Sequence, residues 1–168
     1  MEFKASSNKN KFEIVHDNQI MLSGVKPKWF SSQIIFSHND FHYDIKKSNF
    51  WGTSFQVTKN GLKIGDIKWN WKKGHILFFK DENDDYVTEY YLKSENSKAW
   101  PKADKRYSLN SVKEKPTLNI YYRFKIWKPE IDLEFLETEN FPLLMCAIFL
   151  MWQKQKAEYS GSGGFIGG

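Results

Sequence analysis

The stretch of the sequence best suited to bind another molecule is residues 98–115 (KAWPKADKRYSLNSVKEK). It carries six basic residues against Asp104 and Glu114, so its net charge is +4. Trp100 and Tyr107 are interleaved with these bases. Such a segment suits anionic lipid headgroups, which attract its charge, and single-stranded nucleic acid, whose bases stack on its rings. A long solvated loop between two strands is the third interpretation of the same pattern.

Charge favours the lipid interpretation over nucleic acid. Only two of the 25 basic residues are arginines, and lysine is the weaker choice for bidentate recognition of bases or phosphates. The excess charge is mild, at +4 in residues 1–84 and +1 in residues 85–168, so neither half resembles a nucleic-acid-binding tail. Two further lysines at a strand end extend the patch. The candidate binding residues are Lys98, Trp100, Lys102, Lys105, Arg106, Lys113, Lys115, Lys72 and Lys73.

Possible metal ligands form no convincing site in the sequence. His38 and His42 alternate with Asp40 and Asp44, and imidazole with carboxylate is a ligand set for transition metals. These residues lie across a turn, however, and no remote third or fourth ligand is evident. The acidic run at 81–85 (DENDD) lacks the Gly and the Glu that an EF-hand needs at its sixth and twelfth positions. We therefore expect no metal and no cofactor.

Nucleophile motifs and export signals are also missing. The segment 160–164 lacks the first glycine of a G-x-S-x-G elbow, and the chain has no P-loop. Cys146, the only cysteine, lies among apolar neighbours, where a thiol is normally inert. The N-terminus has no apolar signal segment, and a single thiol fits a reducing compartment. We expect a non-enzymatic, cytoplasmic protein, with peripheral attachment to a membrane left open.

Short β-strands separated by turns are predicted for most of the chain, because aromatic and β-branched runs alternate with turn residues. Asn60-Gly61 lies between strands at 54–58 and 62–69 and is the strongest hairpin signal. Two more hairpins are predicted within 33–47 and 75–93. Further strands are predicted at 12–15, 19–22, 118–128 and 131–136.

One apolar helix follows these strands. Residues 141–152 (FPLLMCAIFLMW) are apolar at eleven of twelve positions, with Asn140 or Thr138 as the cap. Twelve residues span about 18 Å, against about 30 Å of bilayer hydrocarbon, so a membrane span is disfavoured and a short anchor stays open. A helix apolar on all sides must be surrounded on all sides. The expected core residues are Leu144, Ile148, Phe149 and Trp152.

These features predict a mainly β fold: a closed or nearly closed antiparallel barrel of about 10–12 strands around one C-terminal helix. We expect a single domain over residues 1–157, with the helix at about 140–157 and a stop at Gly161. The Gly/Ser-rich segment 158–168 is expected to be disordered. Aromatic-led hairpins followed by the helix FPLLMCAIFLMWQKQK, over about residues 28–157, resemble the tubby C-terminal-like superfamily. That superfamily includes tubby domains, LURP-one-related proteins and phospholipid scramblases.

The resemblance implies a barrel of about a dozen strands and favours a binding or structural protein over an enzyme. Tubby domains bind phosphoinositides through basic surface side chains, but those positions have no residue-by-residue match here. We therefore expect a module that binds acidic phospholipid or a protein partner through basic and aromatic surface loops. The alternatives are a small-ligand carrier or enzyme whose pocket combines separate strands, and a protein tethered to membranes by residues 141–152.

Overall fold

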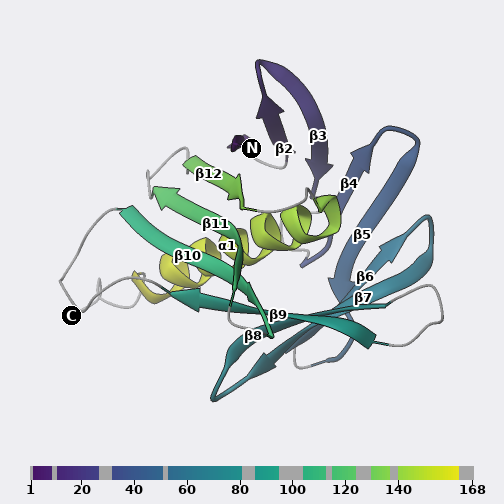
Figure 1. The fold of residues 1–168 in the computed structure, drawn as a ribbon, viewed down its shortest axis with the longest axis vertical. Coiled ribbons are helices and arrows are strands. Elements are labelled where there is room, and N and C mark those ends of the chain that lie inside the picture. The colour runs from purple at the N-terminus through teal and green to yellow at the C-terminus, as the bar shows by residue number, and fades with distance from the viewer. Residues whose placement is uncertain are drawn as a thin grey trace, which may run out of the picture.

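The computed structural model describes residues 2–8, 11–26, 32–50, 53–80, 86–94, 104–112, 115–123, 130–136 and 140–162. Within these ranges the chain forms twelve β-strands followed by one α-helix (Figure 1). The elements are β1 (Glu2–Asn8), β2 (Lys11–His16), β3 (Gln19–Val25), β4 (Ile34–His38), β5 (Phe41–Lys47), β6 (Ser54–Lys59), β7 (Leu62–Asn70), β8 (Gly74–Lys80), β9 (Tyr86–Ser94), β10 (Asp104–Ser111), β11 (Pro116–Arg123), β12 (Glu130–Phe135) and α1 (Phe141–Ser162).

The strands form one antiparallel sheet in which consecutive strands are neighbours. β1 pairs with β2 and also with β12, where Ala5 lies opposite Ile131. The prediction of a mainly β protein with one C-terminal helix is therefore confirmed.

The hairpin turns follow from residues that tolerate a left-handed backbone. Asn60 and Gly61 have φ values of 49° and 83°, as a type I′ turn requires between β6 and β7. Asn39, with φ of 51°, turns β4 into β5. These two predicted hairpins are confirmed, and the third, within 75–93, is present as the antiparallel pair β8–β9. The acidic run 81–85 lies outside the described residues.

Two strands occur where none was predicted. β1 uses the polar N-terminal segment, and β10 lies inside the stretch 98–115 that had been interpreted as a loop. Tyr107 and Leu109 of β10 are buried in the core and alternate with Ser108 and Asn110, which is the period of a strand. The loop interpretation is therefore wrong for residues 104–111.

The helix α1 begins as predicted and ends later. Asn140 caps it: its Oδ1 accepts a hydrogen bond of 3.0 Å from the N–H of Leu143. The helix continues through Gly161, the expected stop, to Ser162, so the prediction of a disordered segment from residue 158 is wrong for 158–162. One glycine after a run of good helix formers costs only about 1 kcal/mol, which does not end a helix by itself. Residues 163–168 lie outside the described residues.

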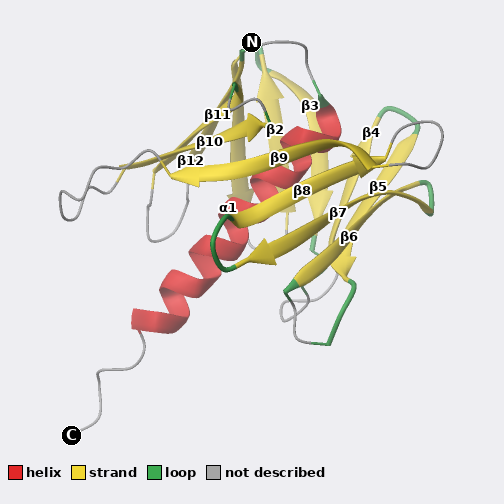
Figure 2. Ribbon diagram, turned by 60° about the horizontal axis from the view of Figure 1, so that its bottom comes forward, coloured by secondary structure: helices red, strands yellow, loops and turns green. Residues whose placement is uncertain are grey.

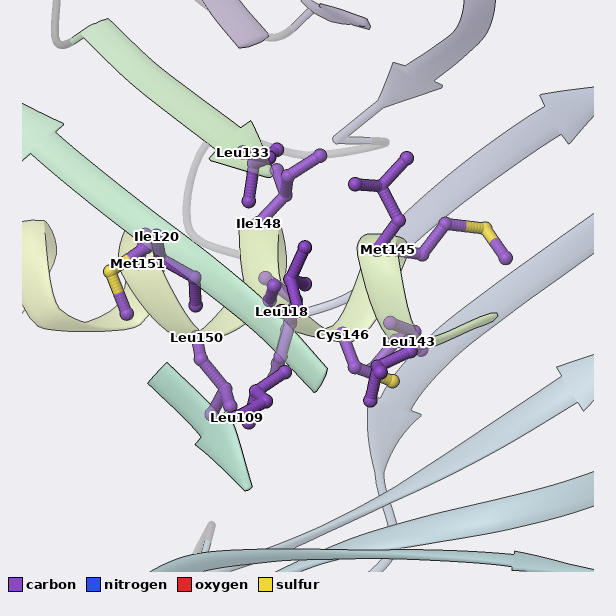
Figure 3. Packing of buried hydrophobic residues seen from close by; sticks show 14 of the residues in the cluster. Leu109, Leu118, Ile120, Leu133, Leu143, Met145, Cys146, Ile148, Leu150 and Met151 are labelled. Carbon is purple, nitrogen blue, oxygen red and sulfur yellow. The ribbon is translucent and has the colours of Figure 1, made fainter. Parts of the chain in front are cut away.

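The first half of α1 forms the centre of the core. Residues 143–151 have no exposed surface, and Trp152 is partly buried against the same cluster. Figure 3 shows the α1 side chains among those of Leu109, Leu118, Ile120 and Leu133 from β10, β11 and β12. The later turns of α1 extend past the strands (Figure 2). Among the described residues, no helix combines the length and apolar character needed to cross a membrane.

Candidate anion-binding site

A cavity of about 520 Å³ lies between the β7–β8 turn and strands β9 and β10. Tyr91 and Lys93 alternate with Leu92, a member of the core, so they point to the outer face of the sheet. The cavity therefore opens on the side of the sheet away from α1. Its described lining residues are Lys72, Lys73, Tyr91, Leu92, Lys93, Asn110, Ser111 and Val112.

The β7–β8 turn brings two of the lysines to this cavity. Asn70 Oδ1 accepts hydrogen bonds from the backbone N–H groups of Lys72, at 2.9 Å, and Lys73, at 3.1 Å. Asparagine forms this kind of turn readily because its side chain reaches the backbone two residues ahead. Gly74 then closes the turn with φ of +77°, a value that glycine adopts without strain. Asn70 and Gly74 therefore determine the path of this turn through local interactions.

The charged side chains that line the described part of the cavity are all cationic. Lys73 Nζ lies 5.0 Å from the ring centroid of Tyr91. The Tyr91 hydroxyl donates a hydrogen bond to Glu89, and this bond is the main cause that raises the pKa of Tyr91, so the phenol stays neutral at physiological pH. None of the described lining residues is acidic. With Lys72 and Lys93, the cavity presents three ammonium groups to an anion.

Asn110 supplies the most unusual group in the cavity wall. Its side chain is only 8% exposed, and its buried Oδ1 has no hydrogen-bond partner among the described residues. The register of β10 against β11 shifts between Leu109 and Asn110, and such irregularities re-aim side chains next to functional sites. An unpaired buried acceptor costs about 1–3 kcal/mol, which a hydrogen-bond donor of a ligand would offset.

The structure brings together only some of the predicted binding residues. Lys72 and Lys73 line the cavity, and Lys115 is exposed beside it, its carbonyl accepting a 3.0 Å hydrogen bond from Ser111 N–H. Arg106 is exposed further along β10, with its guanidinium 5.6 Å from the Tyr121 ring centroid.

Of the remaining predicted residues, the described part of the chain includes Lys105 alone. Lys105 belongs to β10, opposite Tyr122. Lys98, Trp100, Lys102 and Lys113 lie outside the described residues.

Lys93 and Asn110 were missed as site residues. Lys93 lies at the end of a strand that pairs with β8, which the β7–β8 turn precedes, so the hairpin prediction contained a signal for it. Asn110 had no signal in its residue type. Its importance arises from burial and from the shifted register, which depend on the neighbouring strands.

The titratable residues away from the cavity serve the fold. His38 stacks on Phe141 at a centroid distance of 4.0 Å, and its Nδ1 lies 2.7 Å from the carbonyl oxygen of Met21. His42 Nδ1 lies 3.2 Å from Ser37 Oγ. Burial raises the pKa of the Cys146 thiol, which keeps it protonated. Within the described part of the chain, no group of three or more His, Cys, Asp or Glu residues is arranged to hold a metal ion.

The fold and the cavity together define a mainly β protein with a lysine-lined cavity on the outer face of its sheet. No protein-family model, no curated protein and no solved structure matches this chain. The geometry of the site is therefore the basis for assigning a function.

Proposed function

We propose that the protein is a non-enzymatic binding module that holds the phosphate-bearing headgroup of an acidic phospholipid in the cavity between the β7–β8 turn and β9–β10. The observation that carries this proposal is Asn110, whose buried Oδ1 lacks a described partner in a wall shared with three lysines. A cation cluster alone is common on surfaces. A buried polar atom without a partner beside it is rare and calls for an explanation.

The chemistry divides between charge and hydrogen bonding. Lys72, Lys73 and Lys93 attract the phosphate, and each lysine near an anionic membrane contributes about 1 kcal/mol. Asn110 Oδ1 accepts a hydrogen bond from a hydroxyl or ammonium group of the same headgroup. A cavity of about 520 Å³ is within the usual size range of small-ligand sites.

The closure of the sheet around α1 is a second part of what we propose. We infer a sheet closed into a barrel around α1, as in the tubby C-terminal-like superfamily that the sequence resembles. The pairing of β1 with both β2 and β12 supports closure, and the complete burial of residues 143–151 supports a central helix. Such a protein would present its binding residues on the outside of the barrel, where this cavity lies.

A second candidate function is a carrier for a soluble phosphorylated metabolite. The volume of the cavity favours it, since a membrane-docking patch needs no cavity. Both functions use the same phosphate and donor chemistry, so the experiment has to separate the two sources of the ligand.

Flotation with liposomes tests the proposal. The protein is mixed with vesicles of phosphatidylcholine alone or with phosphatidylglycerol, at low and at physiological salt. The test variant is Lys72→Ala/Lys73→Ala/Lys93→Ala. The matched control is Lys11→Ala/Lys46→Ala/Lys47→Ala, which removes the same charge from exposed lysines of β2 and β5, away from the cavity.

We expect flotation only with anionic vesicles, weakened by salt, lost in the cavity variant and kept in the control. Equal losses in both triple variants would reduce the effect to net charge and contradict the site. Calorimetry with soluble glycerol phosphate is the second arm. Binding there without flotation would assign the cavity to the carrier function instead.

A further inference from the structure

The β7–β8 turn carries the most exposed tryptophan in the described part of the chain. Trp71 is 81% exposed, and Trp69, at the end of β7, is 52% exposed. An indole exposed to water contributes little to the stability of the fold, because removing its apolar surface from water would be favourable. The Trp69 ring packs edge-on against His75 at a centroid distance of 4.8 Å, so the Trp71 indole is the exposed apolar group at the tip of this turn.

Lysines precede and follow Trp71 in the sequence of this turn. Lys72 Nζ lies 5.3 Å from the Trp71 ring centroid, and Lys72 and Lys73 both line the cavity described above. Lys68, further back on β7, has its Nζ 5.1 Å from the ring centroid of Phe78. The indole therefore lies next to the ammonium group of Lys72, in a turn whose two lysines also line the candidate anion site.

The tip is also held in place before it meets a partner. Asn70 Oδ1 bonds the N–H groups of both lysines, and the backbone of Gly74 fixes the exit from the turn. A preformed turn loses little conformational entropy on binding. This is the property expected of a segment that enters an interface as a rigid unit.

We infer that the β7–β8 turn is a membrane-insertion wedge: the Trp71 indole enters the interfacial layer of an anionic bilayer while Lys72 and Lys73 contact its phosphates. This inference rests on the proposed function and adds the depth and orientation of binding. Tryptophan concentrates at the headgroup level because its ring is amphipathic, and basic residues beside it add attraction to anionic lipid.

Charge complementarity selects a bilayer as the partner rather than a protein. Protein interfaces are depleted of lysine relative to the rest of the surface, whereas anionic membranes attract it. Trp71, with Lys68 before it and Lys72 after it, therefore suits a layer of lipid headgroups better than a protein surface.

Quenching by brominated phospholipid measures insertion separately from binding. Wild type and Trp71→Phe are bound to phosphatidylglycerol-containing vesicles with bromine at shallow acyl positions, and the indole fluorescence of each is recorded. We expect the wild type to be quenched and most of that quenching to be absent in Trp71→Phe. In flotation, Trp71→Ala should bind at least about tenfold more weakly, because the apolar surface of the indole is removed from water when the ring inserts.

Phe50→Ala is the control, since Phe50 is 92% exposed and belongs to another turn. It should bind like the wild type. Equal quenching of wild type and Trp71→Phe, with flotation intact in Trp71→Ala, would overturn the wedge and leave the cavity function standing. Failure of the wild type to float with anionic vesicles would overturn both.

Discussion

Strand β10 carries buried residues on both of its faces, but they are buried in different ways. On the inner face, Tyr107 and Leu109 pack in the apolar cluster that includes α1. On the outer face, Ser108 is 1% and Asn110 8% exposed, and each has a buried side-chain oxygen with no partner among the described residues. Dispersion and the hydrophobic effect account for the first arrangement. The second breaks the rule that buried polar groups are paired, and such exceptions concentrate at functional sites.

A charge introduced on the inner face should have the largest effect on stability. Ile148→Asp places a carboxylate where the wild-type residue has no exposed surface. We expect loss of about 4–5 kcal/mol or more, enough to unfold a domain of this size. Circular dichroism and thermal melting measure the loss. Leu62→Asp, at a side chain that is 75% exposed, should fold normally; unfolding there too would contradict the assignment of the core.

A cavity in the core has the next largest expected effect. Phe149 has no exposed surface, and its ring centroid lies 4.8 Å from that of Phe55. Phe149→Ala should lower the free energy of unfolding by about 3–5 kcal/mol, measured by denaturant titration. Phe50→Ala removes the same atoms from an exposed position and should cost little. Similar costs for both variants would show that α1 is not tightly packed.

Acid should weaken the fold through His75. Burial first, and the positive charge of Lys154 second, lower the pKa of His75 from 6.5 to about 4. The unfolded chain therefore binds the proton more readily, so stability falls as pH drops from about 6.5 to about 4 and levels off below. The loss is about 3 kcal/mol at most. His75→Phe should flatten this part of the pH profile of unfolding; an unchanged slope in His75→Phe would refute the assignment.

The smallest expected effect on stability belongs to the outer face. Asn110→Leu removes the unpaired acceptor, so the free energy of unfolding should stay within about 1 kcal/mol of the wild type or rise. Binding to anionic vesicles should weaken at the same time. A loss of several kcal/mol would show that the Asn110 amide serves the fold, and the contrast between the two faces would then disappear.

Periodicity and turn chemistry made most of the fold predictable. Asn60-Gly61 identified its hairpin because few other residues accept positive φ. The run 141–152, apolar at eleven of twelve positions, identified the buried helix because apolar side chains cover all of its sides. β10 was missed since basic residues mask the alternation of Tyr107 and Leu109. The lysines of the β7–β8 turn were predicted as part of a basic patch. Lys93 and Asn110 were not, because a cavity depends on which strands become neighbours and on the register between them.

The order of elements along the chain has a consequence for biosynthesis. α1 fills the centre of the core, yet it follows all twelve strands in the sequence. While a ribosome is still extending the chain through β12, the apolar inner faces of the strands have nothing to enclose. The apolar core of this protein can therefore be completed only after residues 143–151 have left the exit tunnel.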